Sequence, residues 1–449
     1  MRPQTWNGIR ARSDRSGCPA LVRGLPWCVV STAEVVAPTT VRTLPVDGLL
    51  AGMPAALLER LPAEAPLAWV RGGDGLVGWG EAARVELTGP DRFAAAELWW
   101  ERWLDGVVVD DPLTVPGTGP VAFASFSFDQ DAGSSVLVVP RVLLGRRDGT
   151  TWVTVVGDGP DLASADLPPV SVPMSPVEVR WSQGSLSTVQ WQGAVRQAVA
   201  RIVRGDLDKV VLARDLVATA SAPVDVRYLL GRLADRYPSC WTFSVDGLVG
   251  ATPELLVRRT GDLVLSRVLA GTVGRLGDDA ADGELADALL GSEKDLEEHE
   301  FAVHSVAAVL AGYCAELDVP EQPKVLRLRN VQHLATDVAG RLTDGSGVLE
   351  LAGALHPTAA VCGTPTDVAL QVIRELEGMD RGRYAGPVGW LGRDGDGEFG
   401  LALRCAEVSG ERLRLFAGCG IVAGSDAEAE LTESQAKFVP IRDALESEG

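Results

Sequence analysis

RGRYAGPVGWLGRDGDGEFGLALRCAEV, residues 381–408, places two apolar runs on either side of a short turn rich in Asp and Gly. The turn is RDGDGE, residues 393–398, and a turn of this kind predicts that the flanking runs pair as antiparallel strands. Comparable turns separate apolar runs elsewhere in the chain, where strands mix with amphipathic helices. We therefore predict an α+β protein whose large, mostly antiparallel sheets pack as a sandwich with helices outside.

The pattern before this segment predicts mainly strands. Residues 66–82 predict a hairpin around Gly72–Gly75, residues 92–104 a helix, and residues 121–129 alternate as a half-buried strand would. Two more strands are expected within the range 134–157. The Pro, Ser and Gly content of the next segment predicts a surface connection over residues 157–187.

The C-terminal part carries all the chemistry that the sequence reveals. A helix is expected from Ser187 to Val203, followed by a strand over Lys209–Ala218. We expect the chain to divide into residues 1–34, a disordered or extended N-terminus, and residues 35–449, a single domain with a variable part at 35–186 and a catalytic part at 187–449.

Composition excludes several classes of function. The 449 residues are 46% hydrophobic, which is ample for a large core, and the net charge of −20 argues against nucleic acid or anionic lipid as a partner. Such a chain needs placed cations or a divalent metal to bind an anionic small molecule. No apolar run reaches the roughly 18–20 residues that span a bilayer. The seven scattered cysteines lack zinc-like spacing and predict reduced core thiols in a cytoplasmic protein.

Two segments combine helical spacing with paired carboxylates, and the first is GSEKDLEEHEF, residues 291–301. Ser292 fits the cap of a helix, and Asp295 and Glu298 lie three residues apart on one face. An acidic first turn that complements the helix dipole is one explanation, and half of a metal site is the other. The expected buried stripe is Leu296, Val303, Val306, Leu310 and Tyr313.

The second acidic segment is SDAEAELTESQAKFVPI, residues 425–441. Ser425 and Glu428 predict another capping box, and Pro440 is expected to kink or end the helix. Two helices with paired carboxylates form a site for a hard divalent cation, and ligation by carboxylates alone favours Mg²⁺, although two solvated faces are the alternative. The residues on one face of this second helix are Glu430, Glu433 and Lys437.

Other segments place polar groups in apolar surroundings. Lys209 opens an apolar strand, either with its head reaching solvent or as a general base in a cleft. Glu254 precedes an apolar run, which is an unusual place for a charge. Tyr384 and Arg404 are candidates for a carboxylate clamp, because Arg offers a bidentate fork. Small residues that let backbone approach a ligand are found in LAGT, residues 269–272, and FAGCGIV, residues 416–422.

The motifs HPT-A-VCGTP, RG-YAGPVGW, GDGEF, AGCGIV and KD--EH all occur within residues 187–445. Together they resemble the chorismate-utilising enzymes, a family of isochorismate synthases, salicylate synthases and the large subunits of anthranilate and aminodeoxychorismate synthases. The resemblance implies the fold of the anthranilate synthase large subunit. Residues 35–155 resemble, less distinctively, the variable N-terminal part of isochorismate synthases.

The resemblance implies a role for both acidic helices. Glu298 and Glu433 would bind one Mg²⁺, with Asp295 and Glu430 acting through water, and the metal would bind the ring carboxylate of chorismate. His333 also matches the family and is either structural or catalytic. The residues implied to bind the substrate are Gly271, Thr272, Ala360, Tyr384, Arg404, Gly418, Gly420 and Lys437.

The resemblance also implies the reaction. Lysine at position 209 is typical of members that add water rather than ammonia, so water would attack C2 while Glu254 protonates the departing C4 hydroxyl. This requires a partly neutral Lys209 and a partly protonated Glu254, and burial favours both. Ala360 is typical of isochorismate synthases, whereas salicylate and anthranilate members tend to carry Thr there. The predicted function is therefore Mg²⁺-dependent conversion of chorismate to isochorismate, with salicylate synthase as the alternative.

A catalytically inactive binding relative is the alternative from a different class, and the intact Lys209, Glu254, Glu298 and Glu433 argue against it. The sequence contains no Cys-His-Glu amidotransferase segment, so no glutaminase partner is expected. We expect a monomer or weak dimer. The sequence does not distinguish a menaquinone pathway from a siderophore pathway.

Overall fold

The computed structural model describes residues 39–46, 57–157, 171–176 and 178–446. The expectation for residues 1–34, and for Cys18 and Cys28, lies outside this part of the chain. Five cysteines lie within it, and all are free and buried, which confirms the prediction of reduced core thiols for these five. None of the helices in the described ranges is both long enough and apolar enough to cross a membrane.

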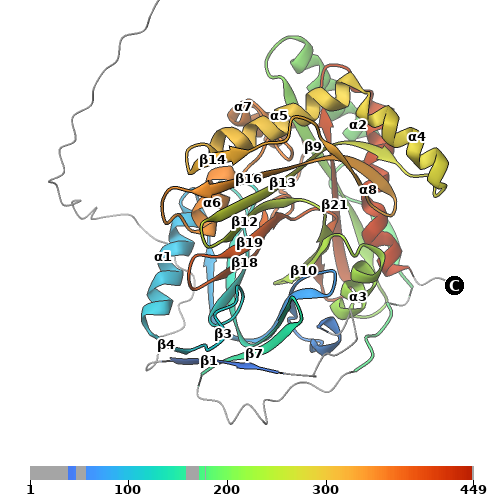
Figure 1. Ribbon diagram of the computed structural model, residues 1–449. Helices are drawn as coiled ribbons and strands as arrows, with labels where there is room; N and C mark the ends of the chain where they lie inside the picture. The colour runs from blue at the N-terminus through green and yellow to red at the C-terminus, as the bar shows by residue number, and fades with distance from the viewer. Residues whose placement is uncertain (1–38, 47–56, 158–170, 177, 447–449) are drawn as a thin grey trace, which may run out of the picture.

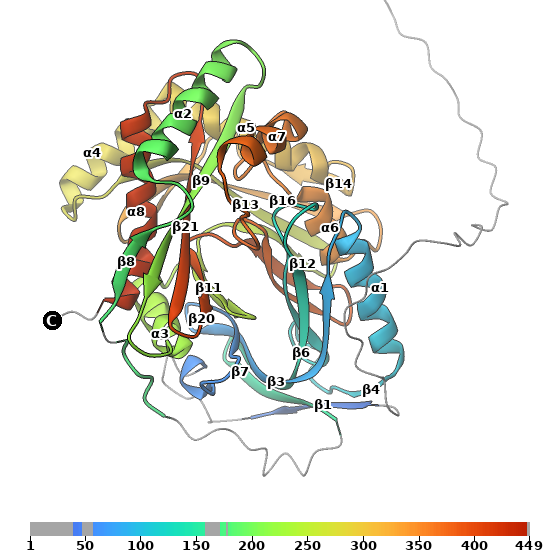
Figure 2. The same cartoon turned by 180° about the vertical axis from the view of Figure 1, so that it is seen from behind.

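The strands form one hydrogen-bonded network that folds over into two facing arms (Figures 1 and 2). The first arm runs in the order β8, β9, β21, β20, β11, β10, β2 and β3. The pairing of β3 with β6 joins it to the second arm, which continues through β5, β18, β19, β12, β13 and β16. Among the described ladders only the pair β1–β4 is parallel, so the predicted antiparallel α+β fold is confirmed.

The bounds of the strands, in chain order, are β1 Thr39–Pro45, β2 Leu67–Arg71, β3 Asp74–Leu87, β4 Val107–Asp110, β5 Val121–Ser125, β6 Ser135–Arg147, β7 Thr150–Val156, β8 Arg180–Gln183, β9 Lys209–Thr219, β10 Trp241–Val245, β11 Leu248–Thr252, β12 Leu255–Thr260, β13 Leu263–Gly274, β14 Cys314–Asp318, β15 Lys324–Arg327, β16 Val331–Leu342, β17 Gly363–Thr364, β18 Pro387–Gly392, β19 Gly397–Leu401, β20 Cys405–Ser409 and β21 Arg412–Ile421. The quoted segment thus supplies the β18–β19 hairpin, whose turn is residues 393–396, because β19 already begins at Gly397 within the predicted turn of 393–398.

Helices cover the outer faces of both arms (Figure 2). Their bounds are α1 Arg92–Asp105, α2 Thr188–Val203, α3 Val226–Arg236, α4 Asp279–Leu290, α5 Glu293–Leu310, α6 Val348–Leu355, α7 Thr366–Leu376 and α8 Ala427–Leu445, with a short 3-10 helix at Leu58–Arg60. Helix α2 packs on β9 and β21 and α8 packs on β21, whereas α5 packs on β13 and β16. The two acidic helices α5 and α8 therefore approach the site from different arms.

Several local predictions are corrected by the fold. The 121–129 strand is not half-buried, because β5 lies between β6 and β18 and every residue of it is buried. The hairpin turn is Gly72–Gly73 alone, since β3 already begins at Asp74. The proposed connection at 157–187 contains strand β8, which pairs with the end of β9.

The two acidic helices also differ in detail from their predictions. Ser292 caps α5 by accepting from the Asp295 N–H, as expected. Helix α8 is capped by Asp426 rather than Ser425, and it runs through Pro440 to Leu445 instead of ending there. In α5 the predicted Leu296 and Val303 are only half-buried. The fully buried face consists of His299, Ala302, Val306 and Leu310.

Candidate active site

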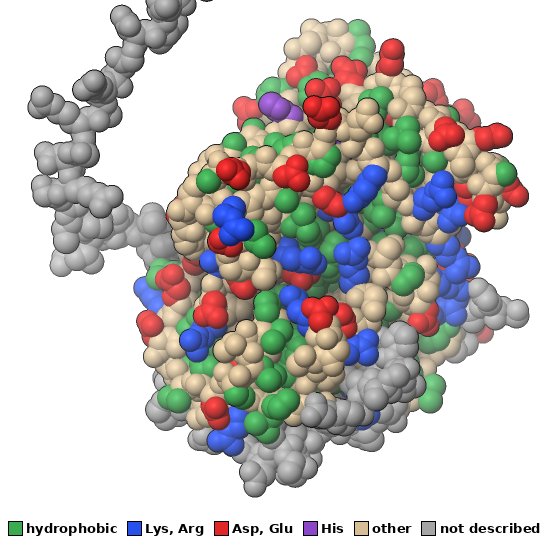
Figure 3. Space-filling model, viewed as in Figure 1, with side chains coloured by type: hydrophobic (Ala, Val, Ile, Leu, Met, Phe, Trp, Pro, Cys, Tyr) green, Lys and Arg blue, Asp and Glu red, His purple; other side chains and the backbone are tan. Residues whose placement is uncertain are grey.

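A cavity of about 260 Å³ lies where β9, β13, β16 and β21 approach α5 and α8. Figure 3 shows Lys and Arg side chains gathered in the hollowed centre of one face of this acidic protein. Nearly all of the predicted site residues line the cavity, and Lys209 is the exception, because it is fully buried and meets the lining through Glu298. The predicted residues in the lining are Glu254, Gly271, Thr272, Asp295, Glu298, Ala360, Tyr384, Arg404, Gly418, Gly420, Glu430, Glu433 and Lys437.

Lys209 is fully buried at the first position of β9. Its ammonium lies 3.1 Å from Glu298 Oε1 on α5, an ion pair that lacks the angle of a hydrogen bond. Burial opposes the charge of the Glu298 carboxylate, but Lys209 outweighs it and lowers the pKa of Glu298. The predicted base and one predicted metal ligand are therefore direct neighbours.

Gly420 on β21 explains how these groups fit so closely. A Cβ at this position would lie 2.4 Å from Glu298 Oε1 and 3.1 Å from Lys209 Cε. Any larger side chain would therefore displace the ion pair. The sequence predicts that Gly420 exposes backbone to an anion, and the space that it leaves for Glu298 and Lys209 is an additional role.

The other carboxylates come from α8. Glu433 lies 2.6 Å from Lys437 Nζ, which also donates to the Gly418 carbonyl at 2.8 Å. Burial and the charge of Glu433 raise the pKa of Glu430 to about 7. Burial opposes the charge of Lys437, but Glu433 outweighs it, so the pKa of Lys437 is raised.

Glu430 and Glu433 bring two carboxylates close together at a position where they can hold a metal ion. Ligand atoms of Glu430, Glu433 and Cys419 lie within 4.8 Å of one another. Burial raises the pKa of Cys419 well above its ordinary value, and its Sγ already donates to the Glu430 carbonyl, so within this group of three only the two carboxylates can face an ion, directly or through water. A buried carboxylate, Glu430, and a half-buried one, Glu433, that repel each other at the edge of a cavity suit a hard divalent cation. Glu298, by contrast, is paired with Lys209.

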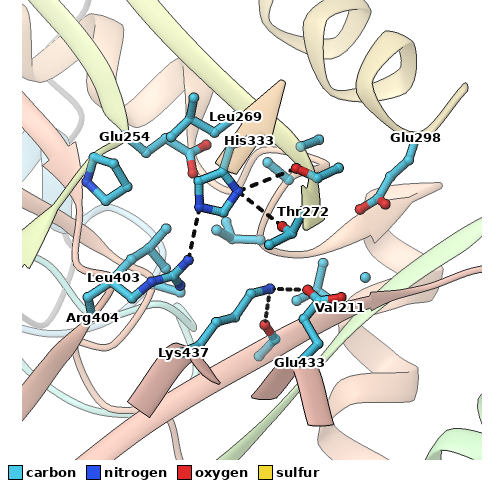
Figure 4. A pocket seen from close by; sticks show the side chains of 18 of the residues that line it. Val211, Glu254, Leu269, Thr272, Glu298, His333, Leu403, Arg404, Glu433 and Lys437 are labelled. Atoms are coloured by element: carbon cyan, nitrogen blue, oxygen red, sulfur yellow. Dashed lines mark hydrogen bonds and ion pairs between the residues drawn. The ribbon is translucent and has the colours of Figure 1, made fainter. Parts of the chain in front are cut away.

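Glu254 lies on the Arg404 side of the cavity, with Glu298 on the far side (Figure 4). Its side chain is 5% exposed, and burial raises its pKa to about 8, against the opposing effects of Arg404 and Lys209. The carboxyl group is therefore protonated at neutral pH. A protonated carboxyl aimed into a cavity has the chemistry of a general acid.

His333 on β16 connects the other polar groups (Figure 4). Its Nε2 lies 3.3 Å from Arg404 Nη2, and its Nδ1 lies 3.0 Å from Thr272 Oγ1 and 3.3 Å from the Gly271 carbonyl. Burial and the charge of Arg404 lower the pKa of His333 well below its ordinary value, so the ring is neutral. Because Arg can only donate, Nε2 accepts and Nδ1 carries the proton. His333 therefore holds Arg404 in place.

Tyr384 lines the cavity beside Gly418. Its ring stacks on Phe416, with centroids 5.0 Å apart, and burial raises the pKa of its hydroxyl. A Cβ on Gly418 would lie 3.0 Å from the Tyr384 hydroxyl oxygen. The predicted clamp residues Tyr384 and Arg404 thus line one cavity, where both can face a ligand carboxylate.

Sequence reasoning missed two charged residues of the lining, Lys294 and Arg381. Lys294 is half-exposed and lies 3.9 Å from Glu430 Oε1. It belongs to the KD--EH motif, so the motif itself pointed to it. Arg381 opens the RGRY segment, but nothing in the spacing indicated that it would reach the cavity. The apolar part of the lining, also largely missed, includes Val211, Pro253, Leu269, Val361 and Leu403.

The chain resembles known proteins over most of its length. A family model described as chorismate binding enzyme matches residues 68–157 and 169–446. Isochorismate synthase DhbC of Bacillus subtilis is 45% identical over 260 residues, which is 55% of this chain and 65% of that protein, just under two thirds of its length. Isochorismate synthase MenF of the same organism is 32% identical over 403 residues, covering 83% of this chain and 86% of the relative.

A solved structure shows the same architecture. MenF, the menaquinone-specific isochorismate synthase from Escherichia coli, has 27% sequence identity and a TM-score of 0.76. The similarity covers 92% of this chain and 97% of that chain. The two-armed fold of this chain is therefore shared with a solved structure of an isochorismate synthase.

Proposed function

The chain belongs to the chorismate-binding enzymes, and from this premise we propose that it is an isomerase that converts chorismate into isochorismate. Water adds at C2 and the C4 hydroxyl leaves. The observation that carries the proposal is the cavity in which a carboxyl protonated at neutral pH, Glu254, shares the space with the cations Arg404 and Lys437. A dianion with a leaving hydroxyl needs both kinds of group.

We assign the proton transfers to Glu254 and Lys209. Glu254 donates its proton to the C4 oxygen as the hydroxyl departs, which its raised pKa allows at neutral pH. Lys209 accepts the proton of the attacking water as a neutral amine, so its ammonium, which faces Glu298 in this structure, first loses a proton. Arg404, Tyr384 and Lys437 bind a carboxylate of the substrate and fix the ring between acid and base.

We assign Mg²⁺ as the metal, held by Glu298 and Glu433 with Asp295 and Glu430 acting through water. The support is the set of carboxylates on α5 and α8 that face one cavity, together with the raised pKa of Glu430 beside Glu433. When bound, the ion supplies positive charge to the ring carboxylate and orients it. Glu298 must then exchange its contact with Lys209 for the metal.

Release of isochorismate, rather than salicylate, is the outcome we assign to this site. Ala360 lies in the lining and offers only a methyl group. A Thr at this position would add a hydroxyl beside the substrate. The names of the relatives agree with this choice, and salicylate synthase is the alternative activity.

Residues 35–449 are proposed to form a single domain. The enzyme is further proposed to be cytoplasmic, to need no glutaminase and to act as a monomer or weak dimer. The ladders β2–β10 and β5–β18 support the first point, because they join the variable part to the catalytic part.

The test is turnover of chorismate by the purified chain, coupled to an isochorismatase, with and without Mg²⁺. We expect product only when the metal is present. Turnover that is unchanged after removal of divalent ions by a chelator contradicts the metal assignment, and the absence of any chorismate consumption contradicts the proposed activity.

A further inference from the structure

Strand β9 carries Lys209, but one of its edges is only partly covered by strands. Along this edge β17 pairs with Lys209 and Val210, and β8 pairs with residues 216–219. None of the described strands lies beside residues 211–215 on this edge. Backbone groups buried in such a gap need other partners, because an unpaired buried N–H or C=O destabilises the fold.

Side chains fill this gap. Arg381 Nη2 donates to the Val211 carbonyl at 2.8 Å, and the Ala213 N–H donates to Glu377 Oε1 at 2.7 Å. The Ala213 carbonyl accepts from Trp191 Nε1 at 3.0 Å. The Val211 N–H donates to the Cys362 carbonyl, just before β17, at 2.8 Å. The three side chains therefore supply the partners that a strand would give to the Val211 carbonyl and to both backbone groups of Ala213.

Arg381 and Glu377 form a buried ion pair, 3% and 1% exposed. Arg381 Nε and Nη2 donate to the two oxygens of Glu377 at 2.9 and 2.5 Å, the two-pronged geometry that only Arg offers. Arg381 Nη1 donates to the Val361 carbonyl at 2.9 Å. One guanidinium thus ties β9 to the loop that carries Ala360 and Val361.

Both tied segments reach the reacting groups. Val211 and Val361 line the cavity, and Lys209 lies two residues before Val211 on β9. Tyr384 follows Arg381 by three residues, and the Tyr384 N–H donates to the Arg381 carbonyl at 3.0 Å. A shift of Arg381 therefore moves three segments relative to one another: β9, which carries the proposed base Lys209, the loop with Ala360, and the segment with Tyr384.

We propose that the Glu377–Arg381 pair is a positioning unit for the reaction, holding Lys209, Ala360 and Tyr384 in register. This inference rests on the proposed function. Neither residue touches the reacting atoms in this scheme, because four of the five Arg381 N–H donors bind Glu377, Val211 and Val361. A displacement of about 1 Å between reacting groups can reduce a rate by roughly 10²-fold, so a loss of register acts on kcat.

The test compares Arg381→Lys with a matched control, Arg227→Lys. Arg227 is also buried and forms a bidentate ion pair, in which it donates to Asp225 at 2.9 and 2.7 Å. It is not among the residues that line the cavity. Lysine keeps the charge at both positions and removes the fork. We expect Arg381→Lys to lower kcat roughly 10²-fold with little change in KM and to increase pyruvate release relative to isochorismate. Arg227→Lys should lower only the melting temperature.

Two further measurements keep the test decisive. If Arg381→Lys does not fold, Glu377→Gln keeps the side-chain shape while removing the counter-charge, and it should lower kcat in the same way. Amide hydrogen exchange in the substrate-free protein should increase at Ala213 and Val361 in Arg381→Lys but not in Arg227→Lys. This exchange measurement needs no reaction, so it distinguishes failure of the positioning role from failure of the proposed function. A variant at position 381 or 377 that folds and keeps native kcat and product ratio overturns the proposal.

Discussion

Replacing Glu254 by Gln is expected to stabilise the protein while removing its activity. Glu254 is 5% exposed, and burial raises the pKa of its carboxyl from the ordinary value of 4.5 to about 8. Between these values the unfolded chain releases this proton and the folded chain retains it, so the wild-type protein loses stability as the pH rises. Gln has the same shape and no proton to release.

The size of the effect follows from the two pKa values. Each tenfold change in an ionisation constant corresponds to about 1.4 kcal/mol, so the cost of holding Glu254 protonated grows from zero near pH 4.5 to about 3 kcal/mol at pH 7. Above pH 8 it levels off near 5 kcal/mol. The difference in free energy of unfolding between Glu254→Gln and wild type should follow this curve.

Urea denaturation of both proteins at a series of pH values from 5 to about 8.5 measures this difference. Glu411→Gln, an exposed position in the turn between β20 and β21, is the control and should not change the pH dependence. Turnover by Glu254→Gln should fall at least about 10²-fold, as expected for loss of a general acid. Parallel pH curves for Glu254→Gln and wild type would refute the raised pKa on which the assignment of the acid rests.

Three other predictions concern the same cavity. For the wild-type enzyme, kcat/KM should fall about tenfold per pH unit above about pH 8, where Glu254 loses its proton; a flat profile to pH 9.5 or above, about 1.5 units beyond that pKa, would exclude it as the acid. Lys209→Ala should lose roughly 10²–10⁴-fold in kcat while product affinity, measured by calorimetry, changes less; a normal rate would mean that water is activated elsewhere. Ala360→Thr should raise pyruvate release relative to isochorismate, at a cost in stability of roughly 1–3 kcal/mol from overpacking, and an unchanged product ratio would show that this side chain does not select the outcome.

Many of the site residues could be predicted from the local spacing of residues in the sequence. The i, i+3 spacing placed Asp295 with Glu298 and Glu430 with Glu433 on helical faces, because a helix repeats every 3.6 residues whatever surrounds it. The strand at Lys209 was predicted from its apolar run. The motif resemblance then placed these elements around one cavity, which local pattern alone does not do.

The parts that were missed depend on tertiary neighbours. The Ser residues that alternate with Phe in 121–129 predicted one solvent-exposed face for this strand. Both faces of the central strand β5 are covered instead, and Ser is small enough to be buried there, as Ser125 is. The pairing of Lys209 with Glu298 requires β9 and α5 to meet, and no spacing in the sequence encodes that contact. Arg381 matters because none of the strands in the described part of the chain pairs with residues 211–215 on the β9 edge opposite β21, which only the sheet topology reveals.

Carrying out the reaction in ¹⁸O-enriched water, with Mg²⁺ present, tests the central claim most directly. The scheme requires that the hydroxyl oxygen at C2 comes from solvent and that the C4 oxygen leaves. Isochorismate separated by chromatography should therefore carry one ¹⁸O atom by mass spectrometry, with the label at C2 by NMR. Unlabelled isochorismate, or salicylate and pyruvate as the main products, would contradict the account.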